Sequence, residues 1–221
     1  MARAPPRDRV GRAGAGRRTL RPVEQPDLVS DQLEGWLRSP GPKTLGSLIA
    51  LFGEKSFAVV FVLLLAVPAL PLPTGGATHV FEVIAMLVAL QLIVGRRQIW
   101  LPARWCRREI AGESGGRLTN GLLKLIRWFE RFSRPRLGVL LRQRPSRAVF
   151  GAIVLAFSVT AFVAPPFSGL DTLPALGVVV LSLGVLLEDV VLAAVGVVIG
   201  ALGAVLVIGL GSIVVRWISH L

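Results

Sequence analysis

The sequence predicts an all-α integral membrane protein with about five apolar helical segments, and three observations support this fold class. First, 53% of the 221 residues are hydrophobic and only 17% are charged, whereas soluble domains carry about 25% charged residues. Second, residues 148–170 and 190–215 contain no charge, and residues 56–81 contain only the titratable His79. A membrane-spanning helix needs roughly 20 mostly apolar residues. Third, a cluster of proline and glycine, residues that end helices, interrupts each of two apolar stretches and predicts two helical hairpins. A basic segment separates the hairpins, and Glu188-Asp189 separate the second one from a last apolar helix.

The N-terminal part is polar and divides into two regions. Residues 1–26 contain seven arginines and few large apolar side chains, so we expect a disordered basic tail; the first 50 residues show no apolar core of a secretory signal peptide. Residues 27–55 predict interfacial amphipathic helices. The first covers "DLVSDQLEGWLRS" and stops before Pro40, and the second starts at Thr44 as its N-cap. We expect both on the cytoplasmic membrane surface.

The first membrane hairpin is predicted over residues 56–100. Its first helix, Phe57–Leu72, would span about 24 Å, but the prolines near its end disfavour helix there. Gly75-Gly76 permit a sharp reversal, and the return helix is expected from Val80 to Gly95. The chain then emerges at "GRRQIWLPARW", whose tryptophans suit the headgroup region and whose arginines mark the cytoplasmic side.

Residues 101–147 predict a basic cytoplasmic segment. Fourteen Lys and Arg side chains lie between residues 96 and 147, against three glutamates, and the positive-inside rule places this segment and the N-terminus in the cytoplasm. Within it, "GLLKLIRWFERFSR" predicts an interfacial amphipathic helix with one apolar stripe, made of Leu122, Leu125, Ile126, Phe129 and Phe132. The net charge of +12 lies beside apolar helices and no nucleic-acid-binding module is recognisable. Anionic lipid headgroups are therefore the expected partner, and nucleic acid is not.

The second membrane hairpin, residues 148–189, repeats the pattern of the first, and residues 190–221 form a C-terminal membrane helix. An apolar run to Ala164 breaks at "APPFSGLDTLP", and another run follows to Leu187. Shifting the first hairpin by 93 residues superimposes the breaks and the flanking helices, which predicts a parallel internal repeat of the kind found in membrane transporters. In the last helix, "GVVIG" at residues 196–200 is a GxxxG motif that permits close helix packing and leaves a homodimer open.

The break in the first hairpin has two interpretations. It is either an ordinary loop just outside the membrane or the tip of a re-entrant hairpin that lines a cavity, because non-helical backbone at membrane depth needs partners in protein or water. In the second case His79 and Glu82 are candidate functional residues, because ionisable side chains within the membrane are costly and usually functional. No catalytic motif is present, and two histidines with the single Cys106 make no metal site. We therefore expect no enzyme activity, metal or cofactor.

Several stretches resemble a known family. They are "GEKSF" (residues 53–57), "PALPLPTGG" (68–76), "ALQLIVGRRQIWLP" (89–102) and "APPFSGLDTLPAL…LGVLLED" (164–189). Over roughly residues 30–215 the chain is similar to the ExoD family of bacterial exopolysaccharide-synthesis proteins. It departs from the family where Val83 or Ile84 stands in place of a proline and where Val190 stands in place of a glycine. The resemblance implies a role in exopolysaccharide production at the inner membrane, and it supplies no catalytic residues.

These observations predict a protein of the bacterial inner (plasma) membrane that supports exopolysaccharide synthesis or export, by handling a lipid-linked or isoprenoid-phosphate headgroup at the helix breaks. Two alternatives stay open: a small ion or proton transporter that uses Glu82, His79 and Glu188-Asp189 as relay groups, and a membrane scaffold that recruits polysaccharide enzymes. The candidate substrate-binding residues lie at the breaks and at the ends of the return helices, and they are Pro71, Pro73, Gly75, Gly76, His79, Glu82, Gln91, Arg96, Pro166, Gly169, Asp171 and Asp189.

Overall fold

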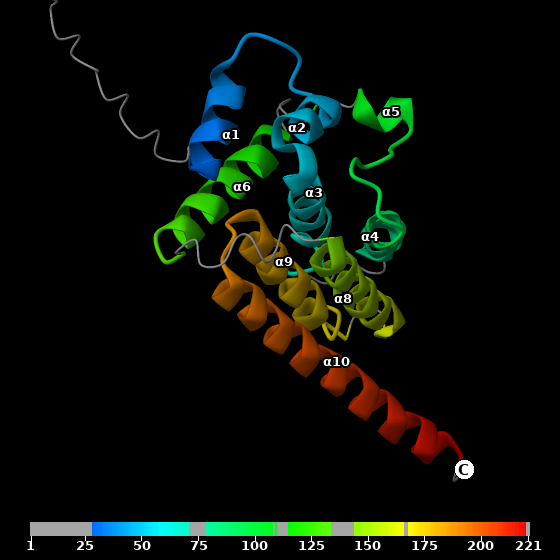
Figure 1. Ribbon diagram of the computed structural model, residues 1–221. Coiled ribbons are helices and arrows are strands. Elements are labelled where there is room, and N and C mark those ends of the chain that lie inside the picture. Colours follow the sequence, from blue (N-terminus) through cyan, green and yellow to red (C-terminus); the bar gives the residue numbers. More distant parts are fainter. Residues whose placement is uncertain are drawn as a thin grey trace, which may run out of the picture.

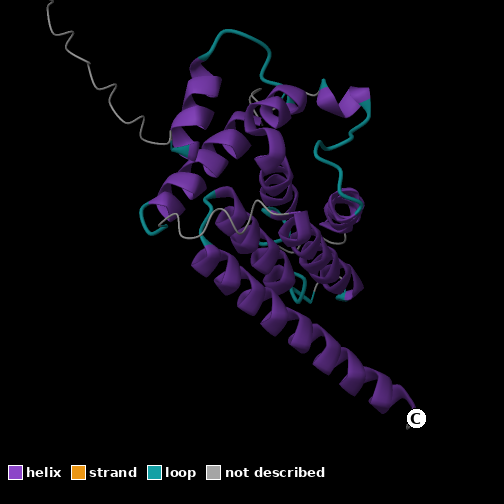
Figure 2. Cartoon of the chain, in the orientation of Figure 1, coloured by secondary structure: helices purple, strands orange, loops and turns teal. Residues whose placement is uncertain are grey.

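The computed structural model describes residues 28–70, 78–107, 109, 115–133, 144–165 and 168–219. Across these residues the regular structure is helical, without strands (Figure 2), so the prediction of an all-α protein is confirmed. Three helical runs are long and apolar enough to cross a membrane, namely Leu45–Leu65, Pro145–Val163 and Val190–Ser212. Two shorter apolar helices cover Thr78–Ile93 and Thr172–Leu186. The expected basic tail lies outside the described residues.

The N-terminal helices form where the sequence predicts them. Helix α1 (Val29–Arg38) ends before Pro40, and α2 (Leu45–Phe52) begins after Thr44, whose hydroxyl accepts a hydrogen bond from the Ser47 amide at 3.2 Å. The Thr44 amide donates to the Ser47 hydroxyl at 3.1 Å, which completes a capping box. A single 3₁₀ turn, Gly53–Lys55, joins α2 to α3 (Ser56–Leu65). The long apolar run therefore begins earlier in the chain than the expected first membrane helix.

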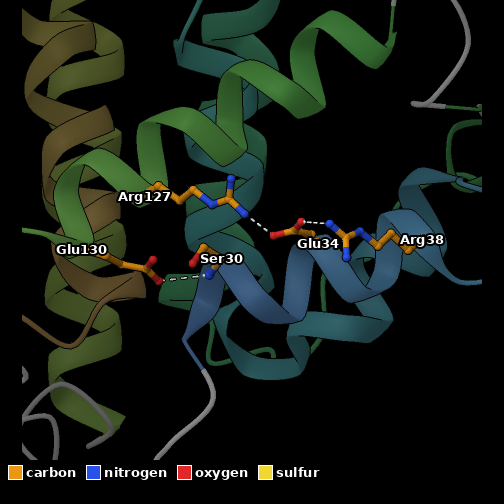
Figure 3. A network of polar contacts seen from close by, with 5 residues as sticks. All are labelled: Ser30, Glu34, Arg38, Arg127 and Glu130. Atoms are coloured by element: carbon orange, nitrogen blue, oxygen red, sulfur yellow. Dashed lines mark hydrogen bonds and ion pairs between the residues drawn. The ribbon is translucent and has the colours of Figure 1, made fainter.

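Helix α6 (Gly115–Glu130) packs against α1 through polar contacts at its C-terminal half. Figure 3 shows Glu34 between Arg38 and Arg127, with an ion pair to each, and the Ser30 amide donating to Glu130 at 3.0 Å. The predicted apolar stripe of α6 faces protein in part, because its residues Leu122 and Ile126 are buried in the core. Phe132 does not join them and is exposed, since α6 ends two residues before it.

The remaining helices form the bundle shown in Figure 1. They are α4 (Thr78–Ile93), the short α5 (Ala103–Cys106), α8 (Arg144–Val163), α9 (Thr172–Leu186) and α10 (Val190–Ser219). Helix α9 lies at the centre and contacts α3, α8 and α10. Most of its residues are buried and none is exposed, as expected of a helix that is apolar on every face. The first helix of the first hairpin is short, because α3 gives way to turns after Leu65, just before the prolines.

Helices α9 and α10 pack in backbone contact along a seam of glycines. A Cβ atom added to Gly177 would lie 2.4 Å from the Gly200 Cα atom, and one added to Gly196 would lie 2.2 Å from the Leu181 amide nitrogen. A Cβ atom added to Gly200 would lie 2.2 Å from the ring of Phe157 on α8. The GxxxG motif therefore packs within the chain, and a homodimer would have to use another face.

The four hairpin helices place their ends in two layers. At one end the start of α3 meets the end of α9 in the ion pair Lys55–Glu188, at 2.9 Å, and Arg147 at the start of α8 pairs with Glu54 at 3.4 Å. We call this the basic end. At the other end the chain leaves α3 and α8 toward the two proline–glycine breaks, and we call it the break end. Figure 1 shows α10 starting beside the end of α9 and projecting beyond the other helices on the break side.

Helices α4 and α9 end in the same way, 93 residues apart. In each, one amide bonds to the carbonyl three residues back and the next amide bonds to the carbonyl five residues back, at distances between 2.8 and 3.3 Å. The residue at the turn has a positive φ, 86° at Gly95 and 57° at Glu188. This is the Schellman type of helix ending, and glutamate is an uncommon residue in that position.

Candidate functional site

Glu82 is fully buried, with 0% of its surface exposed, although it lies in an apolar helix. Its Oε2 atom lies 2.7 Å from Nδ1 of His79, one helical turn earlier, and the two form an ion pair when the imidazole is protonated. Its Oε1 atom has no hydrogen-bond partner among the described residues. A buried polar atom without a partner is costly. This oxygen therefore marks a place where a proton, a water molecule or a ligand group is expected.

The second hairpin contributes to the same place. The ring of His79 packs edge-on against Phe162 of α8, with 5.2 Å between the ring centroids. Asp171, directly before α9, lies within electrostatic range of Glu82. The two hairpins thus bring His79, Glu82 and Asp171 together at the break end, and we call these three residues the acid site.

A buried serine on α8 lies level with the acid site. Gly151 packs against Ala89, and Phe162 packs against the first turn of α4, so the register of this antiparallel helix pair is set at two points. Between them, Ser158 comes to the height of Glu82. Its hydroxyl is buried and, like the Glu82 Oε1 atom, finds no partner within the described part of the chain. Two polar atoms that lack partners therefore lie at one level between two apolar helices.

The turn before α9 places Asp171 at the acid site. Gly169 has a φ of 67°, a conformation that glycine adopts at no steric cost. The Asp171 side chain makes no capping hydrogen bond to α9. His79, Glu82, Gly169 and Asp171 thus lie at the break end, as the sequence predicts for break residues. The other predicted break residues lie outside the described residues, and they are Pro71, Pro73, Gly75, Gly76 and Pro166.

Gln91, Arg96 and Asp189 lie at the basic end and do not join the acid site. Gln91 is nine residues beyond Glu82 on α4, which is about 14 Å of helix. Its side chain clasps the backbone of Trp100: Nε2 donates to the carbonyl oxygen at 3.2 Å, and Oε1 accepts from the amide at 2.8 Å. Gln91 therefore holds the segment that follows α4 against the helix.

Asp189 caps the last helix. Its Oδ1 atom accepts hydrogen bonds from the amides of Val191 and Leu192 at 2.9 and 3.2 Å, and its Oδ2 atom accepts one from the Ser133 hydroxyl at 3.1 Å. These bonds satisfy free amides at the N-terminus of α10 and tie it to the end of α6. The sequence leaves open that Asp189 relays protons or ions. In the structure its side chain instead has a capping role.

A pocket of about 260 Å³ opens at the basic end between the hairpin helices. Its charged lining consists of the two ion pairs, Lys55–Glu188 and Glu54–Arg147, and its apolar lining includes Phe57. Sequence reasoning did not single out Lys55 or Arg147. Their position in the sequence could have identified them, because each is the last charged residue before a long apolar window.

The acid site can bind protons, form hydrogen bonds and attract cations electrostatically. It combines two carboxylates with one imidazole. Across the described residues, no group of three or more His, Cys, Asp or Glu is arranged to hold a metal ion. The site therefore fits a ligand that is small and positively charged, or a donor of hydrogen bonds.

Comparisons with known proteins place these features in a family context. The family described as "Exopolysaccharide synthesis, ExoD" matches residues 29–209. Protein ExoD of Rhizobium meliloti is 30% identical over 167 residues, which cover 73% of this chain and 68% of that protein. The uncharacterized protein slr1875 of Synechocystis sp. is 28% identical over 164 residues, covering 74% of this chain and 76% of that protein. No solved structure matches the chain.

Proposed function

The chain belongs to the ExoD family of exopolysaccharide-synthesis proteins, and from this premise we propose that it is a multi-pass protein of the bacterial inner membrane that supports exopolysaccharide synthesis or export without being an enzyme. In this proposal the acid site binds and releases a proton. The observation that carries it is the carboxyl group of Glu82, which is fully buried, bonded to His79 through one oxygen and without a described partner at the other. Ionisable groups within membranes are costly and mark proton or ion pathways.

Helix α10 supports a position of the acid site inside the membrane. It begins at Val190 at the basic end, and Gly203 packs against Pro174 near the start of α9, thirteen residues or about 20 Å farther along. The hydrocarbon layer is about 30 Å thick, and the sequence of α10 stays apolar for another twelve residues, to Val215. With the basic end at the cytoplasmic headgroups, the break end lies about 10 Å short of the opposite face. This favours re-entrant hairpins over loops outside the membrane.

The charge of the acid site favours a proton over an isoprenoid-phosphate headgroup at the breaks. Glu82 and Asp171 are acidic, and a phosphate beside two carboxylates would be repelled in a medium of low dielectric constant. A proton is attracted by the same arrangement, and the Glu82–His79 pair offers two groups that exchange one. The basic residues that would attract a phosphate lie at the other end of the bundle.

We also propose that the two hairpins are parallel repeats. The matching ends of α4 and α9, 93 residues apart, support this, as does the cross-pairing in which α4 packs on α8 while α3 packs on α9. In transporters, sites lie between such repeats near the middle of the membrane. The acid site, which takes residues from both hairpins, has the corresponding position.

Complementation of a polysaccharide-deficient strain tests the proposal. Glu82→Gln keeps the size of the side chain and an oxygen that accepts a hydrogen bond, but it cannot exchange a proton, so polysaccharide yield should fall while the membrane level stays normal. Glu54→Gln is the matched control, because Glu54 is exposed and lies at the basic end. Wild-type yield from Glu82→Gln would contradict a proton-binding role. Proton flux into proteoliposomes, measured with a pH-sensitive dye, distinguishes transport from a static charge.

A further inference from the structure

A groove of about 550 Å³ lies on the outside of α4 at the basic end. One wall is the helix itself, with Leu87, Leu90 and Val94 among its lining residues. The other wall is the segment after α4, which contributes Trp100 and Trp105. The Gln91 clasp fixes the backbone of this second wall at Trp100 through two hydrogen bonds. The groove is therefore formed by the fold and does not depend on a ligand to assemble it.

The apolar wall belongs to a longer row of exposed side chains. The row follows one face of α4 at alternating spacings of three and four residues, through Val80, Val83, Leu87, Leu90 and Val94. Its length is about 21 Å at the rise of an α-helix. The row is one side chain wide, so it matches a single hydrocarbon chain better than the paired chains of a glycerophospholipid.

The polar end of the groove carries a cation without a described partner. Arg96 lines the groove and is exposed, and no acid among the described residues pairs with its guanidinium. Its backbone is engaged instead: the amide donates to the Gln91 carbonyl at 3.1 Å, and the carbonyl oxygen accepts from Arg147 at 3.2 Å. Two tryptophans beside an arginine at the end of an apolar helix are typical of the headgroup region of a membrane. An anionic headgroup would therefore meet Arg96 where the apolar row ends.

We propose that this groove binds a polyprenyl phosphate, with the isoprenoid chain along the α4 row and the phosphate on Arg96. The choice of occupant rests on the proposed function, because membrane-bound steps of polysaccharide synthesis use sugars carried on such lipids. A guanidinium forms charge-assisted, two-point hydrogen bonds with a phosphate. The acid site lies at the other end of α4 and repels phosphate. In this proposal, therefore, one end of α4 binds a proton and the other end binds a lipid headgroup.

Binding of geranylgeranyl phosphate to the purified full-length protein tests this assignment. Native mass spectrometry in detergent should show a bound molecule, and Arg96→Gln should weaken its binding about tenfold, the effect of losing a hydrogen bond to a charged group. Arg97→Gln is the control, since it removes the same charge one residue away but Arg97 does not line the groove. Geranylgeraniol, which lacks the phosphate, should bind weakly to every form.

Three outcomes would overturn the proposal: equal loss of binding in Arg96→Gln and Arg97→Gln, full competition by phosphatidylglycerol, and equal binding of the alcohol. A diazirine analogue of the lipid, cross-linked to the wild-type protein and mapped by peptide sequencing, gives a readout that needs no variant. It should mark residues between Val80 and Trp105, and attachment elsewhere would refute the groove. Because these assays measure binding alone, they separate this proposal from the proton role, which Glu82→Gln tests through polysaccharide yield.

Discussion

Replacing Gly196 by alanine tests the glycine seam on which the core of the bundle depends. The added Cβ atom would lie 2.2 Å from the amide nitrogen of Leu181 and 2.6 Å from its Cα atom, whereas ordinary contacts begin near 3.4 Å. The shortfall is about 1.2 Å, and the opposing atoms are backbone, so no side-chain rotation relieves it. Helix α10 must move outward by about that distance. Overpacking of this kind costs about 1–3 kcal/mol.

Thermal unfolding of the purified protein in detergent measures the effect. For a chain of this size, each kcal/mol shifts Tm by about 2–4 °C, so Gly196→Ala should lower Tm by about 2–12 °C relative to its control. That control is Gly209→Ala, on the same helix, where nothing lies within 4 Å of the added atom. Both variants gain the same helix propensity, about 1 kcal/mol, so their difference isolates the packing term. Equal Tm values would refute the close approach of α9 and α10.

A double variant sharpens the test. A Cβ atom on Gly184 would lie 2.3 Å from the Ala193 amide nitrogen, in the same seam as Gly196. One outward movement of α10 relieves both clashes, so Gly184→Ala with Gly196→Ala should lose less stability than the two single losses added together. Full additivity would show that the helices relieve the two clashes by separate local movements. The description of α9 and α10 as one rigid interface would then be wrong.

Two further predictions concern the helix caps and the membrane depth of α10. Asp189→Ala should lower the free energy of unfolding by about 0.5–2 kcal/mol, because α10 loses its cap. Asp171→Ala should lower it less, because the Asp171 side chain does not cap α9; the reverse order in denaturant titrations would contradict the capping role. Nitroxide labels at exposed positions of α10 from Val191 to Val205 should be deepest near residue 200, midway along about 30 Å of hydrocarbon. A maximum at Val191 would instead place the break end at the membrane surface.

Much of the helical structure follows from local chemistry and was predictable from the sequence. Thr44 caps α2 because its hydroxyl reaches an amide three residues on, and α3 stops before the prolines because proline cannot continue a helix. The apolar windows predict the long helices, because segments of that composition are driven out of water. The limits of α6 were harder to place, and Phe132 fell outside the helix that was expected to include it.

The partners of the site residues were decided by the tertiary structure. The sequence shows Asp171 and Asp189 as similar acids beside apolar runs, yet the first lies near Glu82 and the second caps α10. That difference arises from the packing of α4 on α8 and of α9 on α10, which depends on contacts between residues far apart in the chain. Local spacing determines that Glu82 lies one turn from His79. Only the register of two packed hairpins determines that Asp171 approaches the same carboxyl group, because electrostatic contact depends on distance in space and not along the chain.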